Sequence, residues 1–262
     1  MALPTAAAII FGGWVLAVVL VVVVTLALWE FYGLFDQLEE TRMSPVLKAL
    51  GVAAGAALLA VCALRRPELI LLSLLAVFWV VAMHQLVVFS RDPEAFDLRP
   101  GLATLMGLLY LPLSLQSFLW LPPLAMLLVL AATAISDTAA LYAGKFFGKR
   151  KIWPAVSPKK TWAGSAGSAL ACVGLTMVYG LLLGDAPWWA WLALGAALNA
   201  ASQFGDFFES ALKRRLGVKD SGRILPGHGG ILDRIDGLLF VLPVYLLARV
   251  IHPFFASGGL TP

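Results

Sequence analysis

Charged residues are scarce in this chain of 262 residues, because Asp, Glu, Lys and Arg together make up 13% of it while apolar residues make up 61%. Soluble globular domains carry about 25% charged residues. Too little charge is present to cover a surface that faces water, and the composition excludes a soluble enzyme. The mean hydropathy of +0.89 indicates instead that a lipid bilayer is the solvent.

Cysteine is scarce as well. Only Cys62 and Cys172 occur, each inside an apolar segment, so the sequence indicates neither a disulfide framework nor a cysteine metal site. The alternation of polar and apolar residues that marks membrane β-strands is missing from runs such as 15–28 and 124–134. The sequence therefore predicts an all-α, polytopic integral membrane protein.

Apolar runs of membrane-spanning length fill most of the chain. A helix needs about 20 residues to cross the hydrocarbon layer, and about eight transmembrane helices are predicted on this basis. They lie at 8–33, 46–64, 68–89, 101–118, 121–143, 162–184, 187–212 and 231–252. No loop is long enough for a soluble domain and no repeat is evident. We expect a single transmembrane domain, 1–262, with N-terminal helices at 1–120 and catalytic helices with cytoplasmic loops at 121–262.

Basic residues mark the loops that should face the cytoplasm. Residues 145–160 contain six Lys or Arg and no acid, the loop at 184–187 contains Asp185 and no base, and the loop at 213–223 is again basic. Counting back through the spans places the N-terminus outside, with Arg65 and Arg66 as the one conflict. The first run lacks the cleavage pattern of a signal peptide and is interpreted as a retained span. The basic residues behind the net charge of +4 are thus interpreted as topology signals and as a surface for an anionic ligand. No nucleic acid is expected as a partner.

Carboxylates gather at the predicted cytoplasmic ends of three spans: Asp137, then Asp206 with Glu209, then Asp233 with Asp236. Each has a structural alternative. Asp137 could cap backbone groups at the interface, Glu209 has a lysine four residues further on, and Asp233 or Asp236 could favour the start of a helix. As a set beside basic loops, they predict a site for Mg²⁺ and phosphate, because proteins hold Mg²⁺ with one or two carboxylates plus substrate phosphates.

Two loops offer groups for phosphate oxygens. The first, SPKKT, contains Ser157, Lys159, Lys160 and Thr161. Its proline prevents a regular helix and leaves backbone N–H and hydroxyl groups available, although a basic turn can also be a topology signal alone. The second, PGHGG at 226–230, surrounds His228 with three glycines that permit close approach of the backbone to a ligand. A flexible connector would not need that histidine.

The segment SALKRRLGVKDSGRILPGHGGILDRID, residues 210–236, resembles the signature of the phosphatidate cytidylyltransferases, also called CDP-diacylglycerol synthases. The resemblance extends to SDT at 136–138, GK at 144–145, FGK at 147–149, SPKKT and WEFY at 29–32. It covers the C-terminal half in detail and the N-terminal half in hydropathy. Ala139 and Ala163 stand where the family usually has Gly and Glu.

The resemblance implies transfer of the cytidylyl group of CTP to phosphatidic acid, which gives CDP-diacylglycerol and pyrophosphate for phospholipid biosynthesis. It implies Mg²⁺, with room for a second cation, and a nucleotidyltransferase in the cytoplasmic (inner) membrane of a bacterial-type cell whose active site faces the cytoplasm. CTP, phosphatidic acid and membrane lipids are the expected partners, and a homodimer is compatible with it.

Specific residues follow from the same resemblance, together with the carboxylate pattern. Metal ligands are predicted at Asp206 and Asp233, then at Asp137 and Asp236. Catalytic groups are predicted at Asp206, Asp233, Lys213 and His228, and substrate-binding groups at Ser157, Lys159, Lys160, Thr161, Lys213, Arg214, Lys219 and Arg234.

Two other functions compete with this interpretation. An ion-coupled transporter would also place carboxylates in the membrane, but it should show related halves and charges near mid-span. A polyprenol kinase would also use CTP, and its product would be a phospholipid with CDP in place of a CDP-lipid with pyrophosphate.

Overall fold

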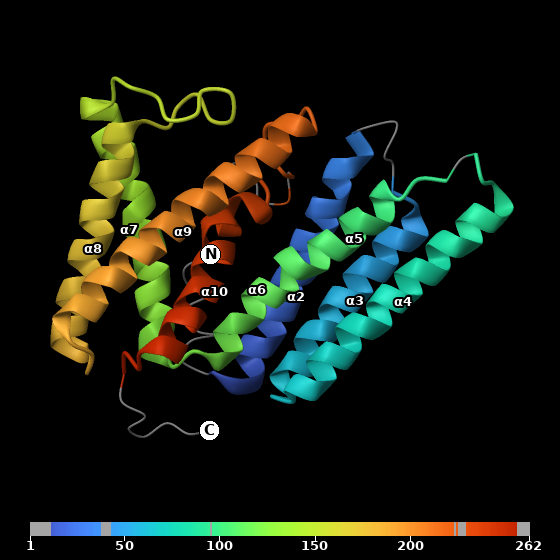
Figure 1. The fold of residues 1–262 in the computed structure, drawn as a ribbon, viewed down its shortest axis with the longest axis horizontal. Coiled ribbons are helices and arrows are strands. Elements are labelled where there is room, and N and C mark those ends of the chain that lie inside the picture. The colour runs from blue at the N-terminus through green and yellow to red at the C-terminus, as the bar shows by residue number, and fades with distance from the viewer. Residues whose placement is uncertain (1–11, 38–42, 95, 223, 225–228, 256–262) are drawn as a thin grey trace. The chain divides into compact units, whose positions relative to one another are not determined.

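The computed structural model describes residues 12–37, 43–94, 96–222, 224 and 229–255, which are helical apart from their connections (Figure 1). One isolated bridge pairs Lys151 with Thr161. The helices are α2 (Gly13–Leu34), α3 (Pro45–Ala63), α4 (Pro67–Arg91), α5 (Arg99–Tyr110), α6 (Pro112–Leu115), α7 (Pro123–Phe147), α8 (Trp162–Leu183), α9 (Trp188–Arg215) and α10 (Leu232–Ile251), with short turns η1 (Phe35–Gln37) and η3 (Gln116–Trp120).

The predicted spans agree with these helices to within a few residues, and the polytopic helical class is confirmed. Among the described residues, six helical segments are long and apolar enough to cross a membrane. They are α2, α3, α4 from Glu68 onward, α5 through η3, α7 and α8. The α9 and α10 helices carry the acids and bases of the predicted site, which lowers their hydropathy.

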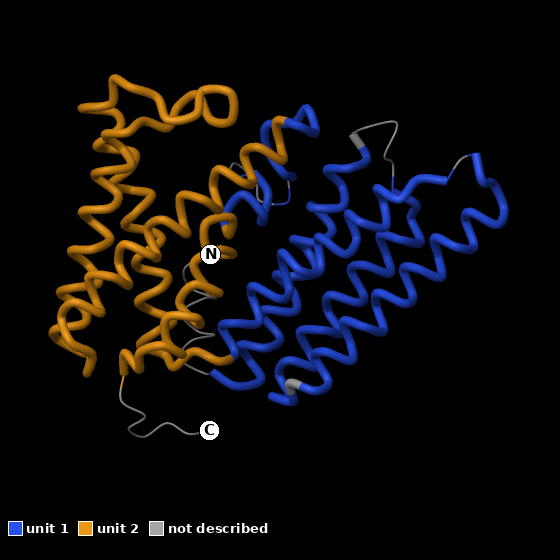
Figure 2. Tube along the Cα trace, viewed as in Figure 1, with its two compact units in different colours: residues 1–119, 215–234 blue, residues 120–214, 235–262 orange. Residues whose placement is uncertain are grey.

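The helices form two compact units (Figure 2). Unit 1 contains Met1–Leu119 and Arg215–Arg234, and unit 2 contains Trp120–Arg214 and Ile235–Pro262. The first boundary lies one residue from the predicted division at 120. The segment Arg215–Arg234, which we assigned to the catalytic half, belongs to unit 1.

In unit 1, a tyrosine from α2 joins three helices. The ring of Tyr32 packs against Gly51 of α3 and Gly107 of α5, where an added Cβ would come within 2.6 Å of ring atoms. Its hydroxyl donates a hydrogen bond of 3.0 Å to the carbonyl oxygen of Thr104. The two glycines therefore allow α3 and α5 to approach α2 around one buried side chain.

The predicted span 101–118 is not one continuous helix. The α5 helix ends at Tyr110, and α6 begins at Pro112 after Leu111. Proline has no N–H to continue the α-helical hydrogen bonds, and its ring clashes with the preceding turn. The span is consequently built from α5, α6 and η3 in succession.

In unit 2, small residues bring α7, α8 and α9 together. An added Cβ at Gly164 would lie 2.8 Å from the carbonyl oxygen of Ala140 on α7, and one at Gly195 of α9 would lie 2.8 Å from the Cα atom of Val173 on α8. The α8 helix begins after Thr161, whose Oγ1 accepts a hydrogen bond of 3.2 Å from the N–H of Gly164. Close helix contacts of this kind are typical of membrane bundles, where association depends on packing.

Candidate functional site

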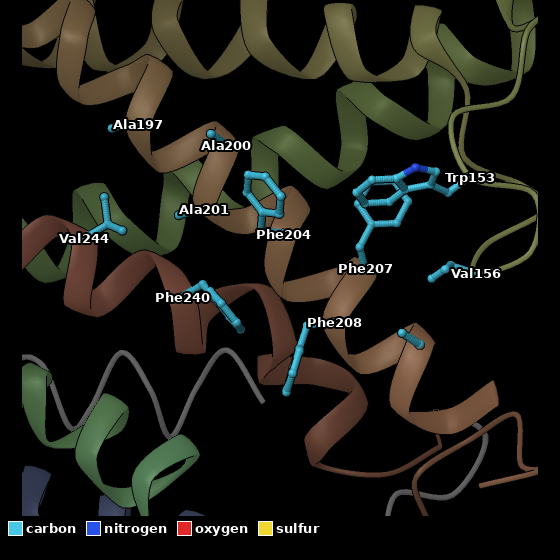
Figure 3. A pocket seen from close by; sticks show the side chains of 11 residues that line it. Trp153, Val156, Ala197, Ala200, Ala201, Phe204, Phe207, Phe208, Phe240 and Val244 are labelled. Carbon is cyan, nitrogen blue, oxygen red and sulfur yellow. The ribbon is translucent and has the colours of Figure 1, made fainter. Parts of the chain in front are cut away.

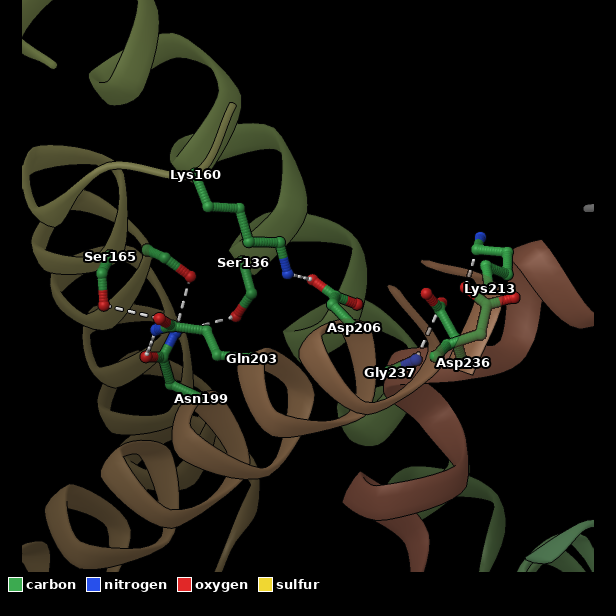
Figure 4. Close-up of polar contacts among 11 residues, drawn as sticks. Ser136, Lys160, Ser165, Asn199, Gln203, Asp206, Lys213, Asp236 and Gly237 are labelled. Carbon is green, nitrogen blue, oxygen red and sulfur yellow. Dashed lines mark hydrogen bonds and ion pairs between the residues drawn. The ribbon is translucent and has the colours of Figure 1, made fainter. Parts of the chain in front are cut away.

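Two glycines bring the predicted acids of α9 and α10 together in unit 2. An added Cβ at Gly205 would lie 2.5 Å from the carbonyl oxygen of Asp236. One at Gly237 would lie 2.9 Å from Ser202 Oγ and 3.2 Å from Asp206 Oδ1. The backbones of the two helices are therefore in direct contact, and Asp206 and Asp236 lie next to each other (Figure 4).

Lys160 extends from the loop before α8 to this pair of acids. Its Nζ lies 2.5 Å from Asp206 Oδ2, and both side chains are partly buried. The same ammonium lies 4.5 Å from the centre of the Phe207 ring. Among the four predicted groups of the SPKKT loop, Lys160 is thus the one that the structure brings to a predicted metal ligand.

Glu209 and Lys213 form the ion pair that we considered as the structural alternative. Lys213 Nζ donates a hydrogen bond of 2.8 Å to Glu209 Oε2, and the Glu209 side chain is 2% exposed. The i, i+4 spacing on α9 explains the pair. Asp236 interacts with both residues, so the pair is part of the same acidic group.

Asp137 on α7 completes the group, because its carboxylate interacts electrostatically with Asp206 and Asp236. The acid cluster is defined here as Asp137, Asp206, Glu209 and Asp236. Four carboxyl groups share this site with the two ammonium groups of Lys160 and Lys213, so its acidic side chains outnumber its basic ones by two.

That surplus of acidic side chains fits a divalent cation, since a buried carboxylate that ionises requires a compensating positive charge. Across the described ranges, no set of three or more His, Cys, Asp and Glu side chains is arranged as a complete metal site. Mg²⁺ does not require one, because it usually takes one or two carboxylates and fills its remaining positions with water and phosphate oxygens. The residues present therefore fit Mg²⁺ whose remaining positions are filled by water or by phosphate oxygens.

Asp233, the other predicted metal ligand, lies in unit 1. Its carboxylate accepts hydrogen bonds from the backbone N–H groups of Ser221, at 3.0 and 3.2 Å, and Gly230, at 2.9 Å. It stands in the first turn of α10. These contacts give Asp233 a structural role, and its role as a metal ligand remains a prediction.

The other predicted substrate-binding residues lie on loops and helix ends. Lys159 is exposed and Ser157 half-buried in the loop between α7 and α8, while the Thr161 oxygen caps α8. Arg214 is exposed at the end of α9. Lys219 and Arg234 are exposed in unit 1, and His228 lies outside the described residues.

A polar network beside Lys160 was missed by the sequence reasoning. Ser165 donates to Gln203, Gln203 donates to Asn199, and Asn199 donates to Ser168, at 2.5, 2.5 and 2.6 Å (Figure 4). Asn199, Gln203 and Asp206 follow one face of α9 at i, i+4 and i+7. That spacing of polar residues within an apolar helix was the signal that could have revealed it.

An apolar cavity of about 590 Å³ lies in unit 2 (Figure 3), and its lining includes Phe207 and Phe208, which stand between Asp206 and Glu209 in the sequence. Its lining residues are Trp153, Val156, Ala197, Ala200, Ala201, Phe204, Phe207, Phe208, Ala211, Phe240 and Val244. Phe207 lines the cavity, contacts Trp153 edge-on at 5.0 Å and also carries the Lys160 ammonium above its ring. One residue thus separates a charged site from an apolar one.

The chain is similar to known proteins over most of its length at the level of a family and over about half of it at the level of individual relatives. The sequence pattern described as "Cytidylyltransferase family" matches residues 1–252. The chain is 45% identical over 133 residues to a phosphatidate cytidylyltransferase of Thermotoga maritima, in an alignment that covers 48% of this chain and 49% of the relative. Proteins of the same name from Bacillus subtilis and Staphylococcus aureus are 47% and 48% identical over 116 and 114 residues, each alignment covering 43% of the relative. The chain therefore spans about half the length of these relatives.

Proposed function

Because the chain belongs to the cytidylyltransferase family, we propose that it transfers the cytidylyl group of CTP to phosphatidic acid and releases pyrophosphate. The observation that carries the proposal is the position of Phe207 between the acid cluster and the apolar cavity. A substrate with a phosphate at one end and acyl chains at the other matches that arrangement. The relatives named phosphatidate cytidylyltransferase support the same substrate.

In the proposed reaction, a phosphate oxygen of phosphatidic acid attacks the α-phosphorus of CTP. A new P–O bond forms, the bond to the β-phosphate oxygen breaks, and pyrophosphate leaves with the electron pair. The attacking group is already an anion, so no Ser or Cys nucleophile is needed. Catalysis then consists of alignment and charge stabilisation.

The residues of unit 2 have distinct proposed roles in this reaction. Lys160 would bind triphosphate oxygens, exchanging part of its ion pair with Asp206 for them. Asp206 and Asp236 would hold Mg²⁺, which when bound offsets the charge of the phosphates. Asp233, three residues before Asp236 in α10, stays a ligand predicted from the sequence. Trp153 and Phe207 would keep the acyl chains beside the reacting phosphate and exclude water from it.

We place the protein in the cytoplasmic membrane with its site facing the cytoplasm, where CTP is available. The support is the charge asymmetry of the loops on either side of α8. Single cysteines at Ala155 and at Asp185, both in exposed connections, can be introduced into a chain that lacks Cys62 and Cys172. An impermeant thiol reagent should label position 155 only from the cytoplasmic side and position 185 only from the outside. The reverse labelling would contradict the orientation.

Product identity tests the proposed reaction. Purified protein in detergent is incubated with phosphatidic acid, Mg²⁺ and CTP labelled in the cytosine ring or in the γ-phosphate. We expect the ring label in a CDP-lipid and the γ label in pyrophosphate. A γ-labelled lipid with free CDP would identify a kinase. If folded, purified protein forms neither a CDP-lipid nor pyrophosphate, the proposal is refuted.

A further inference from the structure

Glu30 is a buried acid in α2 that none of the proposed steps uses. The residue is 5% exposed, and its Oε2 accepts a hydrogen bond of 3.0 Å from the backbone N–H of Leu232, 202 positions further along the chain. The backbone of Ile231 also interacts with the carboxylate. All of these residues belong to unit 1.

The start of α10 explains why an acid is needed at this place. The first N–H groups of a helix have no partner within the helix and are usually satisfied by an Asp, Asn, Ser or Thr side chain at the N-cap. Here α10 begins at Leu232, and the residue before it is Ile231, which has no side-chain acceptor. Glu30 supplies the missing acceptor from another helix, and its negative charge lies near the N-terminal end of the helix dipole.

Two described glycines before α10 pack against the same carboxylate. An added Cβ at Gly222 would lie 2.6 Å from Glu30 Cδ, and one at Gly230 would lie 2.6 Å from Glu30 Oε2. On the other side, the N–H groups of Ser221 and Gly230 donate to Asp233. The backbone of residues 221–222 and 229–232 is thus held by two acids, one from α2 and one from α10 itself.

We infer that Glu30 is a positioning residue for the start of α10, and through it for the acids that α10 carries. The contact with Leu232 and the packing of the two glycines fix where the helix begins and how its first turn is rotated. Asp236 lies one turn further along the same helix, so a displaced start of α10 would displace a predicted metal ligand. The catalytic consequence rests on the proposed function, whereas the effect on α10 does not.

Hydrogen–deuterium exchange of the purified full chain tests this role directly. In Glu30→Ala, peptides that cover residues 229–235 should exchange about tenfold faster or more, since a hydrogen bond to a charged acceptor is lost. Peptides from α3 and α5 in the same unit should change by less than about twofold. Glu30→Gln should have a smaller effect, because its side-chain oxygen can still accept the Leu232 N–H. Glu68→Gln, at an exposed acid in the first turn of α4, is the matched control.

A second pair of variants retains Glu30 and guards against loss of folding. Gly230→Ala places a methyl group against both Ser221 Oγ and the Glu30 carboxylate, whereas Gly33→Ala adds one to α2 where no atom lies within 4 Å. Only the first should accelerate exchange at residues 229–235. In the reaction, Glu30→Ala and Gly230→Ala should lower kcat by about tenfold and change the KM for CTP by less than about threefold, because Lys160, the proposed triphosphate ligand, does not lie on α10.

The outcomes separate this inference from the proposed function. Unchanged exchange at residues 229–235 in Glu30→Ala, or equal acceleration throughout unit 1, would overturn the positioning role. Local acceleration with wild-type kcat would overturn its catalytic consequence. Local acceleration in a protein whose wild type makes no CDP-lipid would leave the role of Glu30 in place and refute the proposed reaction alone.

Discussion

Two acids of unit 1, Glu30 and Asp233, differ from two acids of unit 2, Asp206 and Glu209, in the groups that contact them. In unit 1, Glu30 and Asp233 accept hydrogen bonds from backbone N–H groups of the segment before α10. In unit 2, Asp206 and Glu209 face the ammonium groups of Lys160 and Lys213, and further carboxylates add to them. Glu30 and Asp233 therefore fix the position of the backbone before α10, whereas the acids beside Lys160 and Lys213 are available to bind a cation.

The largest expected effect is on turnover in Asp206→Asn. The substitution keeps the size of the side chain but removes one charge of the acid cluster, so kcat for CDP-lipid formation should fall by about 10²-fold or more. Asp185→Asn, in the connection between α8 and α9, is the control and should be near normal. Steady-state rates at saturating Mg²⁺ measure both. Near-normal turnover in Asp206→Asn would remove the acid cluster from the reaction.

An intermediate effect is expected when the basic side chain of Lys160 or of Arg214 is removed. Lys160→Ala should raise the KM for CTP by about tenfold, as expected for a lost charge-assisted contact, with little change in the KM for phosphatidic acid. Arg214→Ala, at the exposed end of α9, should do the reverse, because it suits a lipid phosphate at headgroup depth.

Lys145→Ala, at an exposed position in the last turn of α7, is the control for charge alone. Equal and small changes for both substrates, abolished by added anionic lipid, would mean that these cations only anchor the protein to the membrane surface.

The smallest of the three effects concerns the apolar cavity. Ala200→Trp fills space that the cavity leaves open, so the KM for phosphatidic acid should rise about fivefold while the KM for CTP stays the same. Ala196→Trp places the same side chain on an exposed position of α9 that does not line the cavity. If both variants behave alike, the cavity does not hold the acyl chains.

Much of the fold was predictable because membrane-spanning length is a property of local sequence. The limits of α3, α8 and α10 were predicted to within one residue at each end. The break between α5 and α6 was not predicted, although Pro112 is its cause. The apolar length of the predicted span 101–118 was given more weight than the missing backbone N–H of Pro112.

The acids were harder to assign than the helices. The Glu209–Lys213 pair was foreseen because i, i+4 contacts are local to a helix. The contact of Lys160 with Asp206 joins residues 46 positions apart, and that of Glu30 with Leu232 joins residues 202 apart. No local pattern encodes such contacts. Asp233 and Asp206 were both predicted as metal ligands, whereas in the structure backbone N–H groups contact the first carboxylate and Lys160 contacts the second.

The most direct test of the difference between the units is the shift of Tm on adding Mg²⁺ alone. A cation that binds the folded protein at about 100 times its Kd stabilises it by roughly 2.7 kcal/mol, which corresponds to a few degrees. We predict this shift in the wild type and in Glu30→Gln, whose altered acid lies in unit 1, and its loss in Asp206→Asn. A wild-type shift in Asp206→Asn would contradict the assignment of the cation to the acid cluster.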